Sequence, residues 1–236
     1  MHSFFVDKKI DDRFIIEGQD VHHIKNVIKL KLAQQVYCIY QSEKYLCLLE
    51  TIEIDQCIVK IIEKIESDTK KVTINLFAGI IREQKWDFLL QKATEIGVDN
   101  IYPVIFKRNV VQVEPKKEEN KIARWQSICK EAAKQSKRVN IPVVHKVIRT
   151  IPGISKIEAD LKLVAWEETV KNSLKNQLQT DFQTINIVIG PEGGIDASEI
   201  AQLEQLNYQV VGLGNNILRA ETASLYLLST IMYEKH

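Results

Sequence analysis

Two stretches near the carboxyl end decide the fold of this chain: GPEGG at residues 190–194 and LGNNILRAETA at residues 213–223. Five of its nine glycines lie between Gly190 and Gly214. Each stretch follows an apolar run and precedes a helical pattern. Because glycine has no Cβ, a ligand can approach the backbone of such turns closely. Ligands of open α/β sheets bind at the carboxyl ends of the strands, so the sequence predicts a small-molecule pocket here.

These turns differ from the two common nucleotide-binding motifs. No Gly-x-Gly-x-x-Gly follows an early strand, and no Gly-Lys-Ser/Thr follows GPEGG. An alternative interpretation is a pair of tight strand-to-helix turns in which glycine is needed only for the backbone conformation and not for a ligand. In the same way, Arg219 and Glu221 could cap the final helix and pair with each other or a neighbour. Glu192 could simply accept backbone N–H bonds.

The composition is that of a globular protein with one or two domains. The chain has 236 residues, of which 45% are hydrophobic and 27% charged. No apolar run approaches the roughly 20 residues of a transmembrane helix, and the first residues lack the apolar core of a signal peptide. The four cysteines stand apart without a Cys-x-x-Cys pair, which predicts reduced core residues and no metal site. We therefore expect a cytoplasmic protein.

Residues 1–70 are predicted to form mainly strands. Short β-prone runs cover residues 14–16, 35–40, 45–49 and 57–62, with a hairpin loop at residues 41–44. One helical pattern runs from Asp20, the expected N-cap, to Leu30. Several strands with one short helix favour a small barrel, and the polar stretch at residues 63–71 is the expected connector.

From residue 72 onward, strands alternate with helices. The expected strands cover residues 72–77, 101–106, 161–166, 185–189 and 208–213, and the helices residues 85–96, 119–137, 199–206 and 222–233. Gly97 stands at a helix C′ position, and Asp196 with Glu199 forms a capping box. This alternation predicts a mostly parallel sheet covered by helices over residues 71–236. Trp86 and Trp125 are expected in its core.

The charge is uneven although its total is only +1. Residues 116–138 hold eight bases and three acids, and Lys25, Lys29 and Lys31 crowd into one short segment beside His22 and His23. Each basic cluster alone is typical of solvated surface. Two such clusters in two modules favour a track for a phosphate backbone. The two histidines lack a partner at metal-ligand spacing.

Over nearly its full length the chain resembles the RsmE-type 16S ribosomal RNA uridine-N3 methyltransferases of the SPOUT superfamily. The two late glycine stretches, in this order and spacing, are its most specific feature. The matching segments are MHSFFV (1–6), HHIKNVIKLK (22–31), QKATEIGV (91–98), RW (124–125), EAAKQSKR (131–138), IP (141–142), IGPEGG (189–194) and LGNNILRAETA (213–223).

The resemblance implies a PUA-like RNA-binding β-barrel at residues 1–70 and a SPOUT methyltransferase domain with a deep trefoil knot at residues 71–236. It implies S-adenosylmethionine (SAM) as cofactor, a homodimer whose site uses both subunits, and one uridine of 16S rRNA in the small ribosomal subunit as target. Departures from the family pattern are Val27-Ile28-Lys29 for Val-Leu-Arg, Ala33-Gln34 for Gly-Asp, and Lys107-Arg108-Asn109-Val110 for Glu-Arg-Ser-Val. Lys29 keeps the charge but gives up a bidentate phosphate contact.

On this basis we expect the following roles. Arg219 is the catalytic cation that stabilises the uracil anion, and Glu221 is the base or an orienting group. The residues expected to bind the cofactor are Trp166, Gly190, Glu192, Gly193, Leu213, Gly214, Ile217 and Leu218. The residues expected to bind RNA are Lys25, Lys29, Lys31, Arg82, Arg108, Lys134 and Arg138. The target uridine should be splayed from its stack, because N3 lies on the Watson–Crick edge.

Two other functions fit parts of the sequence. One is a non-enzymatic RNA-binding ribosome-assembly factor, which would not need two glycine-lined turns. The other is a SPOUT methyltransferase that acts on another RNA, such as the ribose or a base of tRNA. Binding of SAM distinguishes the first from the enzyme, and the position of the methyl group distinguishes the second.

Overall fold

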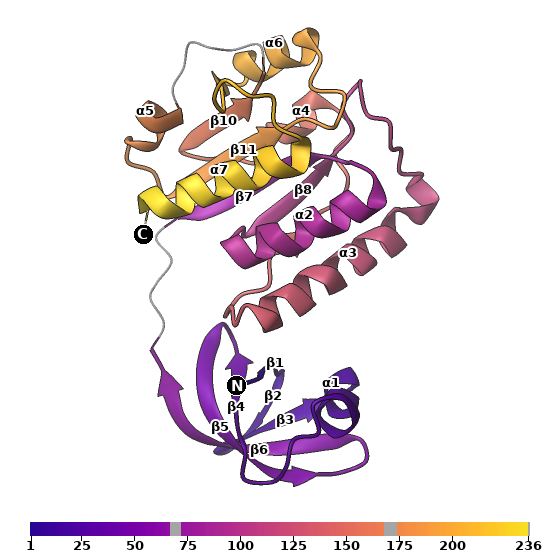
Figure 1. Ribbon diagram of the computed structural model, residues 1–236, viewed down its shortest axis with the longest axis vertical. Helices are drawn as coiled ribbons and strands as arrows, with labels where there is room; N and C mark the ends of the chain where they lie inside the picture. The colour runs from indigo at the N-terminus through magenta and orange to yellow at the C-terminus, as the bar shows by residue number, and fades with distance from the viewer. Residues whose placement is uncertain (67–71, 168–173, 236) are drawn as a thin grey trace. The chain divides into compact units, whose positions relative to one another are not determined.

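A computed structural model describes residues 1–66, 72–167 and 174–235 (Figure 1). The chain divides into two compact units. The first comprises Met1–Thr69 with Ala133–Asn140, and the second comprises Lys70–Ala132 with Ile141–His236. Of the expected connector at residues 63–71, the first part is strand, because β6 (Gln56–Ile65) extends into it. Residues 67–71 and the expected boundary between residues 70 and 71 lie outside the described ranges.

The first unit contains a curled six-stranded sheet in the order β1-β4-β5-β6-β3-β2. Its other strands are β1 (Ser3–Phe5), β2 (Lys8–Ile10), β3 (Arg13–Glu17), β4 (Gln35–Tyr40) and β5 (Glu43–Ile52). Only β1 and β4 pair in parallel; the remaining pairs are antiparallel. Alternate side chains point inward, and Phe14, Ile16 and Val59 are buried in its core.

Two local predictions for this unit are wrong in detail. The pattern at residues 20–30 forms a short helix α1 (Gln19–His22) followed by the π-helix η1 (His23–Val27), and Gly18 rather than Asp20 is the N-cap. The loop between β4 and β5 is shorter than expected. Gln41 and Ser42 both have positive φ angles of 50° and 64°, as in the type I′ turns that connect two twisted strands.

The second unit contains a parallel six-stranded sheet in the order β12-β10-β11-β7-β8-β9. The strands are β7 (Thr73–Gly79), β8 (Asn100–Val104), β9 (Val143–Val144), β10 (Leu161–Ala165), β11 (Thr184–Ile189) and β12 (Gln209–Val211). The predicted alternation of strand and helix is thus confirmed. The strands β1, β2 and β9 are not predicted from the sequence patterns at residues 3–5, 8–10 and 143–144.

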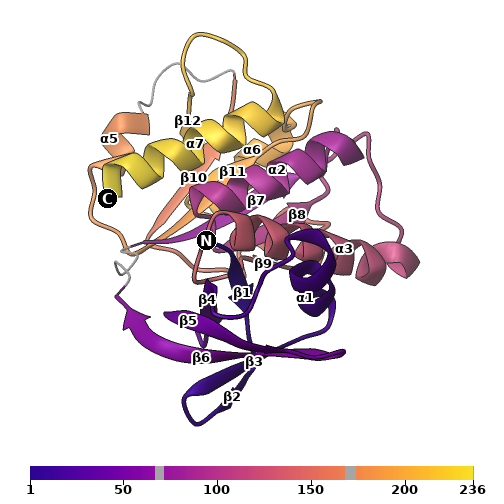
Figure 2. The same ribbon diagram turned by 60° about the horizontal axis from the view of Figure 1, so that its bottom comes forward.

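Helices cover both faces of this parallel sheet. They are α2 (Glu83–Ile96), α3 (Pro115–Gln135), which ends in the first unit, α4 (Ile151–Ile154), α5 (Leu174–Leu178), α6 (Ala197–Gln205) and α7 (Ala220–Lys235). Helices α2 and α7 pack against each other over one face (Figure 2), and α4 and α6 share a cluster on the other. Trp86 and Trp125 are buried in the hydrophobic cluster on the face covered by α2 and α7, as predicted. Gly97 ends α2 with φ 131°, and Asp196 and Glu199 form the predicted capping box of α6.

A ladder of asparagine side chains links three neighbouring strands of the parallel sheet. The Nδ2 group of Asn75 donates to Oδ1 of Asn186 at 2.8 Å, and Nδ2 of Asn100 donates to Oδ1 of Asn75 at 2.9 Å. His145 completes the ladder, with Nε2 2.8 Å from Oδ1 of Asn100. Burial lowers the pKa of His145. These bonds satisfy buried polar groups only in one register, so they help to fix the strand alignment.

All four cysteines are buried, as predicted. Within the described residues, no group of three or more His, Cys, Asp or Glu side chains is arranged to hold a metal ion. Over the same residues, none of the helices combines the length and apolar character needed to cross a bilayer.

Candidate active site

A cavity of about 480 Å³ opens in the second unit where β10, β11 and β12 end. This volume lies within the usual range for small-molecule sites. The two late glycine stretches form much of its wall, so they share one hollow. The lining residues are Lys85, residues 165–167, 189–192, 194–195 and 212–220, and Ala223.

Close backbone contacts explain why glycine is needed around this cavity. A Cβ on Gly79, at the end of β7, would lie 2.4 Å from the backbone nitrogen of Pro191. A Cβ on Gly193 would lie 2.7 Å from the carbonyl oxygen of Arg108. Real Cβ atoms do not approach backbone this closely, so both glycines let the 190–194 turn pack tightly against neighbouring segments. That packing fixes the shape of the cavity wall.

Most of the residues expected to bind the cofactor line this cavity. They are Trp166, Gly190, Glu192, Leu213, Gly214, Ile217 and Leu218. Gly193 does not line it and faces Arg108 instead. The side chain of Ile217 is 85% exposed, which leaves a large apolar surface at the mouth of the cavity.

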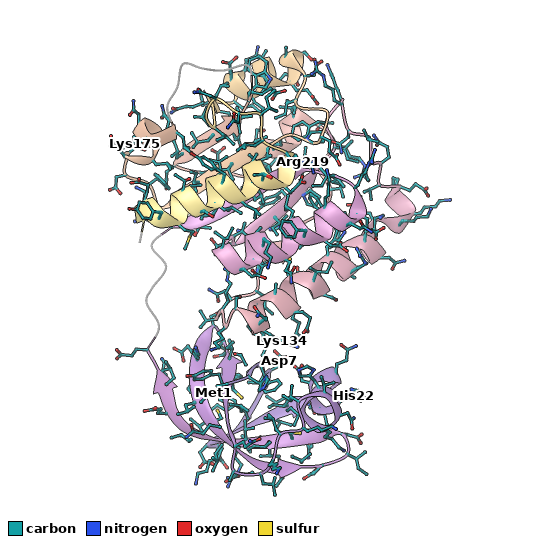
Figure 3. All side chains as sticks on the ribbon, viewed as in Figure 1. Met1, Asp7, His22, Lys134, Lys175 and Arg219 are labelled. Atoms are coloured by element: carbon teal, nitrogen blue, oxygen red, sulfur yellow. The ribbon has the colours of Figure 1, made fainter. Side chains whose placement is uncertain are left out.

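Of the two expected catalytic residues, Arg219 lines the cavity and Glu221 does not. Arg219 directly precedes α7 and is exposed (Figure 3). Glu221 lies in the first turn of α7 and pairs with Lys85, with 3.6 Å between Oε1 and Nζ. The ion-pair partner of Glu221 is therefore Lys85. The helix-capping interpretation of the sequence allowed either Arg219 or another neighbour as this partner.

Glu221 also has an unusual buried atom. Its Oε2 is inaccessible to solvent, and no hydrogen-bond donor within the described part of the chain reaches it. A buried polar atom without a partner costs about 1–3 kcal/mol and calls for an explanation. Lys85, on the other side of the pair, lies in the first turn of α2 and lines the cavity.

Hydrogen bonds hold the loop after β8 beside the 190–194 turn. The backbone N–H of Lys107 donates to Oε1 of Glu199 at 3.0 Å, and its Nζ donates to Oγ of Ser198 at 2.6 Å. Asn109 Oδ1 accepts from the backbone of Phe106, and its Nδ2 donates to the carbonyl oxygen of Ile80. The residues that depart from the family pattern therefore anchor this loop.

The residues expected to bind RNA are divided between the units. Lys25 donates to the carbonyl oxygen of Glu53 at 3.1 Å, and Lys29 and Lys31 are exposed. Lys134 lies 2.7 Å from Asp20 in a largely buried ion pair within the first unit, which also contains Arg138. In the second unit, Arg82 is the N-cap of α2 and Arg108 pairs with Asp196 at 3.2 Å.

Sequence reasoning missed several residues of this site, among them Lys85, Glu167 and Pro191, which line the cavity. Pro191 stands inside the quoted GPEGG motif, and Glu167 directly follows the expected Trp166, so proximity in the chain could have indicated both. Lys85 lies more than 100 residues earlier, and no local signal connects it with the glycine turns.

Comparison with known proteins gives a consistent result. Residues 68–232 match the RNA methyltransferase domain family, so the chain contains an RNA methyltransferase domain. Two relatives are each called ribosomal RNA small subunit methyltransferase E. The protein of Mesomycoplasma hyopneumoniae is 36% identical over 97% of this chain and 98% of its own length, and that of Bacillus subtilis is 32% identical over 99% and 97%. The chain belongs to the ribosomal RNA small subunit methyltransferase E family.

The fold agrees with this membership. The crystal structure of the Neisseria gonorrhoeae ribosomal RNA small subunit methyltransferase E bound to S-adenosylmethionine matches 99% of this chain and 97% of its own, with a TM-score of 0.88 and 26% identity. A mixed α/β architecture with a curled sheet and a parallel sheet is therefore shared with this relative.

Proposed function

We propose that this protein transfers the methyl group of SAM to N3 of one uridine in 16S rRNA of the small ribosomal subunit. The observation that carries the proposal is that both glycine stretches line one and the same cavity at the carboxyl ends of three parallel strands. The full-length similarity to ribosomal RNA small subunit methyltransferase E, and the SAM bound to a relative of the same fold, support it.

The cavity suits SAM in size and chemistry. Its volume of about 480 Å³ and its backbone-lined wall would accept the adenosine and methionine portions. Leu213 and Leu218 offer apolar surface, and Glu167 and Glu192 offer acceptors for hydroxyl or ammonium groups. When bound, SAM supplies an electrophilic methyl group on a positively charged sulfur.

The protein's part in this reaction is positioning and charge. A uridine N3 is a poor nucleophile while it holds its proton, so the site must favour the anion. Arg219 stands at the cavity with its charge available for the developing negative charge on the uracil oxygens. Transfer in line also requires alignment and exclusion of water, and the apolar loop around Ile217 would cover the reacting atoms.

The wider assembly belongs to the same proposal. We infer that residues 1–70 form a PUA-like RNA-binding barrel and residues 71–236 a SPOUT methyltransferase domain whose two glycine loops form a trefoil knot. We infer further that two copies form a homodimer and act in the cytoplasm. Exposed Lys29 and Lys31 in the first unit and Arg108 in the second support RNA contact by both units.

One experiment tests the function directly. The purified protein is incubated with SAM and small ribosomal subunits from a strain that lacks the gene, and digested rRNA is examined by mass spectrometry. We expect N3-methyluridine at one position. A methyl group on ribose, or on tRNA alone, would show that the protein methylates a different position or a different RNA. Failure to bind SAM in calorimetry would favour the assembly-factor alternative.

A further inference from the structure

Lys85 occupies a position that general rules of helix stability disfavour. It lies in the first turn of α2, where the helix dipole favours acidic side chains and opposes a cation. Its side chain is 36% exposed and lines the cavity. Local rules are broken most often at functional sites, where another gain compensates for the cost.

The partner of Lys85 breaks a second rule at the same place. Glu221 is 13% exposed, and its Oε2 atom has no hydrogen-bond donor among the described residues. At 3.6 Å, the distance from Nζ of Lys85 to Oε1 of Glu221 is longer than a hydrogen bond. The ammonium group therefore keeps donors for another acceptor, while the carboxylate holds it near the cavity.

Helix packing brings this lysine to the same cavity as Arg219. Helices α2 and α7 lie side by side (Figure 1), with Met232 near the end of α7 against Gly97 at the end of α2. Their first turns consequently meet at the other end, where Lys85 and Glu221 pair. Lys85 and Arg219 are the two cations among the lining residues that the structure describes.

The proposed reaction calls for two cationic groups. Loss of the N3 proton spreads negative charge over the two carbonyl oxygens that flank N3. We propose that Lys85 is a second catalytic cation, whose ammonium group donates to one of these oxygens while Arg219 serves the other. Glu221 orients Lys85. This inference rests on the proposed uridine-N3 methylation and adds a residue to it.

The balance of the step is simple. The N3–H bond breaks and the proton passes to water. The N3 electron pair then forms the bond to the methyl carbon as the carbon–sulfur bond breaks and leaves its electrons on sulfur. Lys85 and Arg219 stay protonated throughout and lower the energy of the anion.

The test uses Lys85→Met, which removes the charge and keeps the length of the side chain. At neutral pH we expect kcat to fall about 10²-fold, the effect typical of one lost oxyanion donor, with SAM affinity within about threefold of the original protein. The deficit should shrink as the pH rises, because the uracil anion then forms without help. Lys85→Arg should retain a larger share of the activity.

The control is Lys162→Met, which removes another ion-paired lysine of the second unit, outside the cavity lining. It should leave kcat and its pH profile unchanged. A lower SAM affinity with unchanged kcat in Lys85→Met would overturn the inference, as would a deficit that is equal at every pH. If the original protein forms no N3-methyluridine, the proposed function itself fails, which is a separate outcome.

Discussion

At the scale of single residues, Arg219 decides whether the cavity is catalytic. Removal of its guanidinium by Arg219→Ala should lower kcat about 10²–10³-fold, because the group proposed to stabilise the developing anion is lost. SAM affinity should stay within about threefold, since much of the cavity wall is backbone and apolar side chain. Turnover on small subunits and calorimetry with SAM measure the two quantities.

Arg219→Lys provides the matched control for that variant. It keeps the charge but loses the planar fork of the guanidinium, so we expect an intermediate rate. Normal turnover in Arg219→Ala would remove this residue from the mechanism.

Gly79 carries a different prediction, because it shapes the cavity without lining it. The new Cβ of Gly79→Ala would meet Pro191 and Gly190 backbone at 2.4 and 2.8 Å, so the 190–194 turn must move. We expect a loss of about 1–3 kcal/mol in the free energy of unfolding and SAM affinity at least about tenfold weaker. Urea denaturation and calorimetry measure these changes.

Gly153→Ala is the comparison for Gly79→Ala. Its new Cβ would meet only the side chains of Ile148 and Thr150, which can shift more readily than backbone. SAM affinity should be unchanged in that variant. Equal affinities in both variants would show that the contact between Gly79 and Pro191 does not shape the site.

At the scale of elements, the start of α6 links a helix cap to the loop after β8. Asp196 accepts hydrogen bonds from the Oγ and the backbone N–H of Ser198 and pairs with Arg108. The bonds from Ser198, and then the charge of Arg108, lower the pKa of this carboxyl below its ordinary value of 3.8. The ionised carboxylate is therefore favoured in the folded state.

This pKa shift sets the pH range in which Asp196→Ala should be destabilised. A lowered folded-state pKa contributes stability that is present above 3.8 and is lost as pH falls through the lower folded-state value. The variant should thus melt at a lower temperature than the original protein near pH 7, and the gap should narrow below pH 3.8. Glu204→Gln, at an exposed position of the same helix, should show no such gap. A gap that is independent of pH would contradict the cap.

Local patterns explain why these elements could be predicted. The capping box at Asp196 and the end of α2 at Gly97 depend on residues a few positions apart, and the structure contains both. The π-helix η1 could not be foreseen, because the same apolar spacing suits an ordinary helix. Pairing between strands, as in β9, depends on a partner far along the chain.

At the scale of the whole molecule, the parallel sheet and its cavity followed from the alternation of strands and helices with two glycine turns. The pair of Lys85 and Glu221 did not, because it depends on how α2 and α7 pack. The ion pair of Lys134 with Asp20 was equally hidden, since the two residues are separated by more than 100 positions. Sequence thus indicated the turns that line the site and the cation Arg219 within them, whereas tertiary packing brought Lys85 beside them.

The proposed RNA binding would involve the whole chain, whose net charge of +1 gives little general attraction for a polyanion. Affinity for RNA should therefore depend on a few local basic side chains. Each of them would release counterions from the RNA when it neutralises a phosphate. We expect Lys31→Gln to reduce the slope of log affinity against log salt by about 0.7–0.9, because exposed Lys31 would neutralise one phosphate. SAM affinity should not change. Fluorescence anisotropy with labelled rRNA over a series of KCl concentrations measures the slope.

Lys8→Gln separates this effect from a mere change of total charge. Lys8 lies in the same unit, but its Nζ is 2.8 Å from Oε1 of Glu17, so its charge is already paired within the protein. The slope should be the same as in the original protein. If both variants lowered the slope equally, total charge rather than a contact by Lys31 would govern binding, and the basic segment at residues 25–31 would lose its assigned role.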